Sequence, residues 1–174
     1  MKYFIAGVHA VGKTFLCKGY ALKNKCIHKS ASDLIKEYKA QSWHDEKFTF
    51  DIDNNQEILI KALGKFNDID SPMLLLDGHF VLLDEKGDFK SIDSSVFVRM
   101  KIDGIVLIEN EINVIEKRIN ERGVSHITYD IGDFILSERQ HAESISNELG
   151  IKIIKLHSPS YDDFSIAIEM LGAK

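Results

Sequence analysis

The sequence predicts a three-layer α/β/α fold around a mostly parallel, five-stranded sheet. Short, continuous apolar runs, such as residues 72–77 and 103–109, alternate along the chain with segments of helical periodicity. Such runs are typical of parallel strands that are buried on both faces, and right-handed crossovers place the intervening helices over those faces. The first run, residues 3–6, leads directly into a glycine-rich loop and a predicted helix, which is the start of a βαβ unit.

We expect one compact domain over residues 1–174, because a chain of this length buries a sizeable core by itself. Its 44% hydrophobic and 28% charged residues are ordinary for a globular protein, and no apolar segment is long enough to cross a membrane. The formal charge of −5 argues against a broad nucleic-acid-binding surface. Cys17 and Cys26 suggest neither a metal-ligand pair nor a disulfide framework, and the chain has no N-terminal signal, which favours the cytoplasm.

The glycine-rich stretch at residues 7–14, GVHAVGKT, has the spacing GxxxxGKT of a phosphate-binding loop. Its glycines let the backbone curl so that successive N–H groups cradle nucleotide phosphates at a helix N-terminus. Lys13 is expected to reach the β- and γ-phosphates, and the Thr14 hydroxyl to bind Mg²⁺. Ala10 stands where a second glycine often sits, and it is strained if that position needs a positive φ. The residues expected to contact the nucleotide are Gly7, His9, Ala10, Val11, Gly12, Lys13, Thr14 and Phe15.

The first half of the chain supplies three strands and three helices. Ser32 and Asp33 form an expected N-cap pair in front of the second helix. The pattern then loosens over residues 41–53, where aromatic residues are scattered among charges. This block is interpreted either as a small insert that closes over a substrate or as a helix hairpin that only stabilises the core. The expected strands are 3–6, 26–30 and 72–77, and the expected helices are 13–22, 34–39 and 54–66; the scattered aromatic side chains are Trp43, His44, Phe48 and Phe50.

The second half continues the alternation of strands and helices. Gly123 and Gly150 follow strongly helical segments and are good C-caps, since glycine adopts the left-handed conformation that ends a helix. A short hairpin is expected around residues 85–88, and a loop over residues 124–130. The expected elements are a hairpin at 80–92, helices at 94–100, 111–122, 131–149 and 161–171, and strands at 103–109 and 151–156.

Two polar residues follow the third apolar run, at the sheet edge where ligands of parallel sheets collect. Asp77 ends that run, and an acid placed opposite the loop threonine can orient Mg²⁺, although it could instead cap the next turn. His79 emerges near the same edge. It could position an attacking water or substrate oxygen, contact a base, or be an ordinary satisfied polar residue.

Five further residues are candidates for contacts with phosphate groups. Arg118 and Arg122, spaced i, i+4 on one helix, suit a clamp on a transferring phosphoryl group, and surface ion pairing is the alternative for each. Arg139 could approach the same phosphates if the preceding loop folds over as a lid. Asp33 and Lys36 lie at the exit of the second strand, where a phosphate acceptor would sit, but they also suit a helix cap and a solvated lysine.

The order of these parts resembles the adenylate-kinase-like branch of P-loop nucleotide kinases over nearly the whole chain. Residues 77–79, Asp-Gly-His, resemble the Asp-x-His of archaeal-type adenylate kinases and of ribosome-associated adenylate-kinase-like ATPases. Residues 32–37 and 118–123 are more similar to the ribosome-associated group, whereas residues 87–89 and 138–141 are more similar to the archaeal enzymes.

The resemblance implies a P-loop NTPase fold with a nucleoside-monophosphate-binding insert near residues 31–67 and a short lid near residues 123–133. It implies ATP as phosphate donor and a nucleotide as acceptor. The residues themselves predict Mg²⁺ as cofactor and Lys13, His79, Arg118 and Arg122 as the catalytic residues. The chain departs from metabolic adenylate kinases because Lys36 stands where the acceptor-site helix usually has an arginine, and because the lid contains none. Other acceptors, or ATP hydrolysis in a switch that binds a protein partner, therefore remain open.

Overall fold

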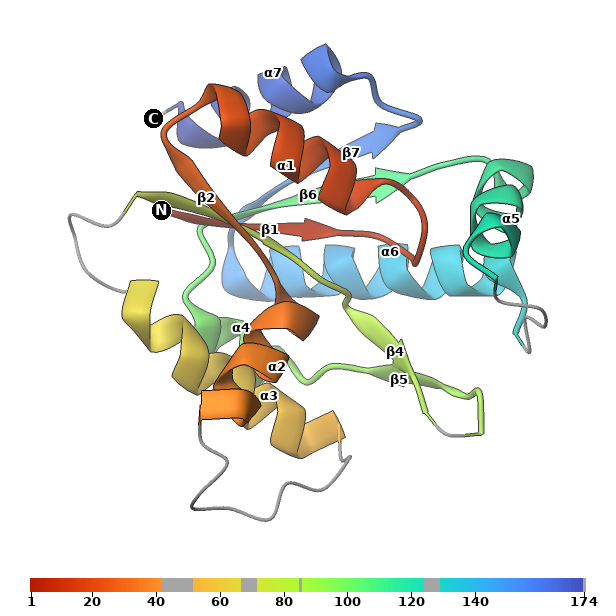
Figure 1. The fold of residues 1–174 in the computed structure, drawn as a ribbon, viewed down its shortest axis with the longest axis horizontal. Helices are drawn as coiled ribbons and strands as arrows, with labels where there is room; N and C mark the ends of the chain where they lie inside the picture. The colour runs from red at the N-terminus through yellow and green to blue at the C-terminus, as the bar shows by residue number, and fades with distance from the viewer. Residues whose placement is uncertain (42–51, 67–71, 85, 124–128, 174) are drawn as a thin grey trace.

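A five-stranded sheet organises the molecule in the computed structural model, which describes residues 1–41, 52–66, 72–84, 86–123 and 129–173 (Figure 1). All neighbouring strands of this sheet pair in parallel, in the order β2–β3–β1–β6–β7. The strands are β1 (Lys2–Ala6), β2 (Cys26–Ser30), β3 (Met73–Asp77), β6 (Gly104–Glu109) and β7 (Lys152–His157). The predicted three-layer architecture is confirmed.

Helices cover both faces of the sheet (Figure 1). Helices α1 and α7 lie on one side, and α2, α3, α4 and α6 lie on the other, with α5 at the end where β1 and β6 terminate. The helices are α1 (Lys13–Lys23), α2 (Ala31–Gln41), α3 (Ile52–Leu63), α4 (Ser94–Met100), α5 (Ile112–Glu121), α6 (Ile131–Leu149) and α7 (Tyr161–Gly172). None of the helices in these described ranges is long and apolar enough to span a membrane.

The alternation of side chains along β1 divides the core in two. Tyr3 and Ile5 belong to one cluster of buried residues, whereas Phe4 and Ala6 belong to the other. Successive side chains of a strand point to opposite faces, so a strand that is apolar at every position is stable only when helices cover both sides. This is the physical reason that a continuous apolar run predicted a central parallel strand.

Most element boundaries lie within two residues of the prediction. The expected hairpin is present as β4 (Val81–Leu83) and β5 (Phe89–Ser91), which pair antiparallel, and a 3₁₀ turn (Gly64–Phe66) follows α3. The predicted N-cap pair is wrong: α2 begins at Ala31, directly after β2, so Ser32 and Asp33 lie in its first turn. The aromatic residues of 41–53 and residues 124–128 of the predicted lid lie outside the described residues.

Strand register brings the ends of three strands to one edge. Ile5 of β1 and Ser30 of β2 are both register partners of Asp77, the last residue of β3. The loop at residues 7–12 follows β1, so it emerges at the same edge as Asp77. The fold therefore places the glycine-rich loop, the strand-end acid and the start of α2 side by side.

Candidate functional site

The loop between β1 and α1 has the backbone conformation that its glycines were expected to allow. Gly7 and Gly12 have φ values of 140° and 119°, and Ala10 has a φ of 61°. A side chain at Gly7 would collide with the carbonyl oxygen of Ile108, so only glycine fits there. The suspected strain at Ala10 is confirmed, because an L residue in the left-handed region crowds its own Cβ against the backbone.

Lys13 folds back into this loop. Its Nζ donates hydrogen bonds to the carbonyl oxygens of Gly7, at 2.6 Å, and Val8, at 3.1 Å, and the residue is only 7% exposed. Burial lowers the pKa of this ammonium to about 8, although the nearby carboxylates of Glu138 and Asp77 favour the charged form. The two carbonyl oxygens thus hold the ammonium group of Lys13 against the loop.

Glu138 of α6 links the loop to the other segments at this edge of the sheet. Its buried carboxylate accepts hydrogen bonds from the backbone N–H groups of Gly7 (3.1 Å), Phe80 (2.9 Å) and Val81 (2.7 Å). Burial raises the pKa of Glu138, and these N–H donors together with Lys13 oppose that rise. One side chain therefore joins the loop after β1 to the turn after β3.

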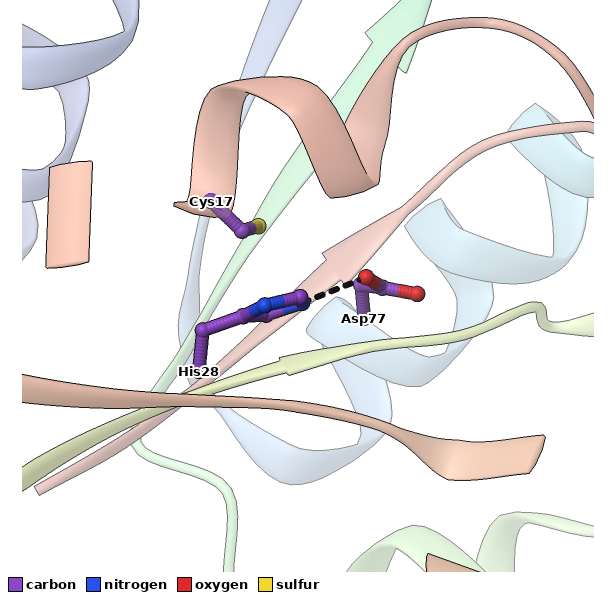
Figure 2. A group of neighbouring side chains, drawn as sticks. All are labelled: Cys17, His28 and Asp77. Carbon is purple, nitrogen blue, oxygen red and sulfur yellow. Dashed lines mark hydrogen bonds and ion pairs between the residues drawn. The ribbon is translucent and has the colours of Figure 1, made fainter. Parts of the chain in front are cut away.

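Asp77 connects the loop threonine with β2 (Figure 2). Its Oδ2 accepts a hydrogen bond from the Thr14 hydroxyl at 3.1 Å, and the same oxygen lies 2.6 Å from Nε2 of His28. Mg²⁺ prefers oxygen ligands, so a hydroxyl and a carboxylate at hydrogen-bonding distance suit that ion, directly or through water. The third side chain in Figure 2, Cys17, comes from α1 and is fully buried.

Two histidines and an aromatic ring form the wall beside the loop. The rings of His9 and His79 lie 4.2 Å apart between centroids, and Phe134 is stacked on His79 at 6.4 Å. Burial, reinforced by the charge on Lys13, lowers the pKa of His9 to about 4 and that of His79 well below its usual value. Both imidazoles are therefore neutral at pH 7. The Nδ1 atom of His79 is buried and has no hydrogen-bond partner among the described residues.

A cavity of about 440 Å³ extends from the loop to α2 and α3. At the loop end it is lined by His9, Ala10, Val11, Gly12, Lys13, Thr14, Asp77, His79 and Arg122. At the far end its walls are mainly apolar or neutral, with side chains of Ile35, Asn55, Gln56, Leu59 and Met100. Gln56 is 7% exposed, and its Oε1 has no hydrogen-bond partner in the described part of the chain. A buried amide oxygen of this kind can accept a hydrogen bond from a ligand or from a bound water.

The three predicted arginines have different surroundings. Arg122 lines the cavity. Arg118 contacts the loop from α5, where its Nη1 donates to the carbonyl oxygens of Ala10 (3.2 Å) and Val11 (2.8 Å). Arg139 forms two hydrogen bonds with Glu109, at 2.6 and 2.8 Å. The structure therefore brings one of the three to the cavity and uses the other two to hold neighbouring segments.

Three other predicted nucleotide contacts lie away from the cavity. Phe15 is 80% exposed on α1, and Asp33 and Lys36 are exposed on α2. None of the three belongs to the residues that line the cavity. From α2, Ala31, Ser32 and Ile35 line the cavity instead.

Sequence reasoning missed Glu138, His28 and Gln56 as parts of this site. Glu138 had a signal: it interrupts the apolar stripe of α6 formed by Phe134, Ala142 and Ile145, and an acid on a buried stripe needs partners. His28 and Gln56 had none, because their partners depend on how β2 and α3 are placed in space.

Comparisons with known proteins agree with this architecture. A family model described as an AAA domain matches residues 6–131. None of the curated proteins compared with the chain matches it. Among solved structures, an unliganded sugar kinase from Janibacter sp. has a TM-score of 0.56 at 15% identity, with 98% of this chain and 94% of that chain covered.

Two further structures have the same fold. Thymidylate kinase from Candida albicans has a TM-score of 0.54 at 14% identity, with 98% of this chain and 90% of that chain covered. An uncharacterized protein from Eubacterium ventriosum has a TM-score of 0.52 at 10% identity, with 100% and 99% covered. At these identities the likeness concerns the fold alone.

Proposed function

We propose that this chain, which belongs to the AAA-domain family, is an Mg·ATP-dependent phosphotransferase of the nucleoside-monophosphate kinase type that transfers the γ-phosphate of ATP to a nucleotide. The observation that best supports the proposal is that one cavity extends from the phosphate loop to α2 and α3. A binding loop alone explains nucleotide binding. A cavity that continues beyond it also provides room for an acceptor next to the transferable phosphate.

In this proposal the loop residues bind the donor. Backbone N–H groups of the loop and the Lys13 ammonium bind the phosphates, and Thr14 and Asp77 hold Mg²⁺. Bound Mg²⁺ would neutralise charge on the phosphates. Arg118 fixes the loop carbonyls from outside, while Arg122 faces the phosphates within the cavity and neutralises the phosphoryl group as it moves. Phosphoryl transfer needs little covalent chemistry from the protein, so positioning and charge supply most of the effect.

The acceptor occupies the far end of the cavity. Its phosphate lies toward Arg122, and its base lies between the apolar walls with a donor directed at Gln56. Asp33 and Lys36 take part only if α2 shifts when substrate binds, as segments next to substrate sites commonly do. The segments predicted as an acceptor insert, residues 31–67, and as a lid, residues 123–133, keep these roles in the proposal.

A second candidate is an adenylate-kinase-like ATPase that acts as a nucleotide-dependent switch for a protein partner. The unpartnered Nδ1 of His79 favours it, because a neutral imidazole beside the phosphate loop can accept a hydrogen bond from an attacking water and orient it. In a switch of this kind hydrolysis is slow and no acceptor is phosphorylated.

One experiment separates the two candidates. The purified chain is incubated with Mg·ATP and a panel of nucleoside monophosphates, and the products are separated by ion-exchange chromatography. A new nucleoside diphosphate derived from the added monophosphate supports the kinase. Free phosphate as the only product supports the switch, and the absence of any turnover contradicts both.

A further inference from the structure

We propose that Cys17, His28 and Asp77 form a second metal site, which takes a thiophilic divalent cation such as Zn²⁺ and thereby withdraws Asp77 from the Mg²⁺ site. The three residues come from α1, β2 and β3 and meet between α1 and the sheet (Figure 2). One ligand atom of each lies within 4.8 Å of the other two. Among the described residues, no other group of His, Cys, Asp and Glu ligand atoms meets this condition.

The donor set fits Zn²⁺ and not Mg²⁺. A thiolate, an imidazole nitrogen and a carboxylate oxygen are the three ligand types of zinc sites, whereas Mg²⁺ prefers oxygen throughout. The charges also balance, because a divalent cation with one thiolate and one carboxylate has no net charge. A buried position tolerates a metal site without net charge better than a charged one, and Cys17 and Asp77 are 0% and 5% exposed.

The geometry needs only a small adjustment. Tetrahedral zinc places its ligand atoms about 3.3–3.6 Å apart. His28 Nε2 and Asp77 Oδ2 are 2.6 Å apart in the metal-free chain, so they separate by less than about 1 Å when the ion enters. The Cys17 S–H bond breaks and its proton leaves to solvent as the S–metal bond forms. His28 binds through the Nε2 lone pair, and its ring proton moves to Nδ1.

The cavity gives the ion a way in and a fourth ligand. Thr14 and Asp77 both line the cavity at the loop end, and the ligand oxygen of Asp77 lies within 4.8 Å of the Sγ of the buried Cys17. The Thr14 hydroxyl lies 3.1 Å from Asp77 Oδ2, so this oxygen or a water from the cavity completes the tetrahedron. Both oxygens are the ones assigned to Mg²⁺ in the proposed function. When Zn²⁺ occupies this second site, it therefore excludes Mg²⁺ and lowers the rate of phosphoryl transfer.

The chain provides its own control, because it has only two cysteines. Co²⁺ is titrated into the reduced, full-length, nucleotide-free chain, and the near-ultraviolet thiolate-to-cobalt charge-transfer band is recorded. We expect one equivalent of Co²⁺ to produce the band in the wild type and in Cys26→Ser, and Zn²⁺ to remove it. We expect no band in Cys17→Ser, and at least a tenfold weaker Co²⁺ affinity in His28→Gln.

Two results would overturn this second site: no charge-transfer band in the wild type, or a band that disappears with Cys26→Ser and survives Cys17→Ser. Should Cys17→Ser fail to fold by circular dichroism, undiminished Co²⁺ affinity in folded His28→Gln would equally overturn it.

A separate measurement follows ATP turnover at fixed Mg²⁺. The Zn²⁺ concentration for half inhibition should be at least tenfold higher in Cys17→Ser, and an unchanged value would refute the competition for Asp77. The cobalt spectrum does not depend on turnover, so failure of the phosphotransferase assignment leaves it informative.

Discussion

At the scale of single residues, Lys13 is held by backbone carbonyls before any nucleotide arrives. With a pKa near 8 in the free chain, its ammonium starts to lose its proton just above neutral pH. Bound phosphates favour the ammonium, so the pKa is higher in the complex and ATP binding takes up a proton in this range. The affinity for ATP must therefore fall as the pH rises.

We predict that the Kd for Mg·ATP is constant up to about pH 7 and then increases by up to about tenfold per pH unit above pH 8. Isothermal titration calorimetry between pH 7 and 9.5 measures it. In Lys13→Arg the guanidinium does not titrate, so any remaining affinity should be independent of pH in this range. Equal slopes in the two proteins would show that Lys13 is not the titrating group.

Glu138 is the other residue on which the loop depends. Truncation in Glu138→Ala leaves three buried N–H groups without an acceptor, and we predict a loss of about 3 kcal/mol in the free energy of unfolding. Urea denaturation measures the loss. The matched control on the same helix is Glu143→Ala, which removes an exposed ion pair with Lys155 and should cost less than about 1 kcal/mol. Similar losses in both variants would refute the role of Glu138.

At the scale of elements, α5 and the residue that caps its C-terminus contribute two arginines with separate tasks. Arg122 lines the cavity, so we predict that Arg122→Ala lowers kcat by about 100-fold, the effect of removing one charge that stabilises the transition state. Steady-state turnover of ATP with a saturating acceptor measures it. Lys117→Ala, an exposed position on the same helix, should leave kcat within about twofold. If Arg122→Ala lowers kcat by less than about tenfold, Arg122 does not stabilise the transition state as proposed.

Helix α3 contributes the neutral end of the cavity. Gln56→Leu keeps the volume of the side chain but removes its hydrogen-bonding groups, and we predict a KM for the acceptor about tenfold higher with little change in the KM for ATP. Gln140→Leu, at an exposed position of α6, is the control. Equal changes in both KM values would mean that Gln56 only supports the fold.

At the scale of the whole molecule, the layered fold was predictable because it depends on local patterns. The apolar runs of β1, β3 and β6 require cover on both faces, and GVHAVGKT fixes where the first helix starts. The conformation of the glycine-rich loop was predictable from the same stretch, since one strand, one loop and one helix form it.

The contact partners of the other site residues could not be predicted, because these contacts join residues that are far apart in the sequence. Glu138 contacts Gly7 over 131 positions, and His28 contacts Asp77 over 49. Helix α2 starts three residues before the predicted start at residue 34, and its residues Asp33 and Lys36 do not line the cavity. Helix boundaries depend on tertiary packing as well as on local signals, and side chains rotate by about 100° for each residue of shift.

The central claim is that the γ-phosphate of ATP passes to an acceptor bound in the same cavity. The most direct test incubates the chain with γ-labelled Mg·ATP and a saturating acceptor, and measures how the label divides between acceptor and free phosphate. We predict that most of the label reaches the acceptor and that Lys13→Ala retains less than about a tenth of the wild-type rate, a barrier change above about 1.4 kcal/mol. Label found only in free phosphate for every acceptor tested, or a Lys13→Ala variant that keeps more than this fraction, would contradict the account.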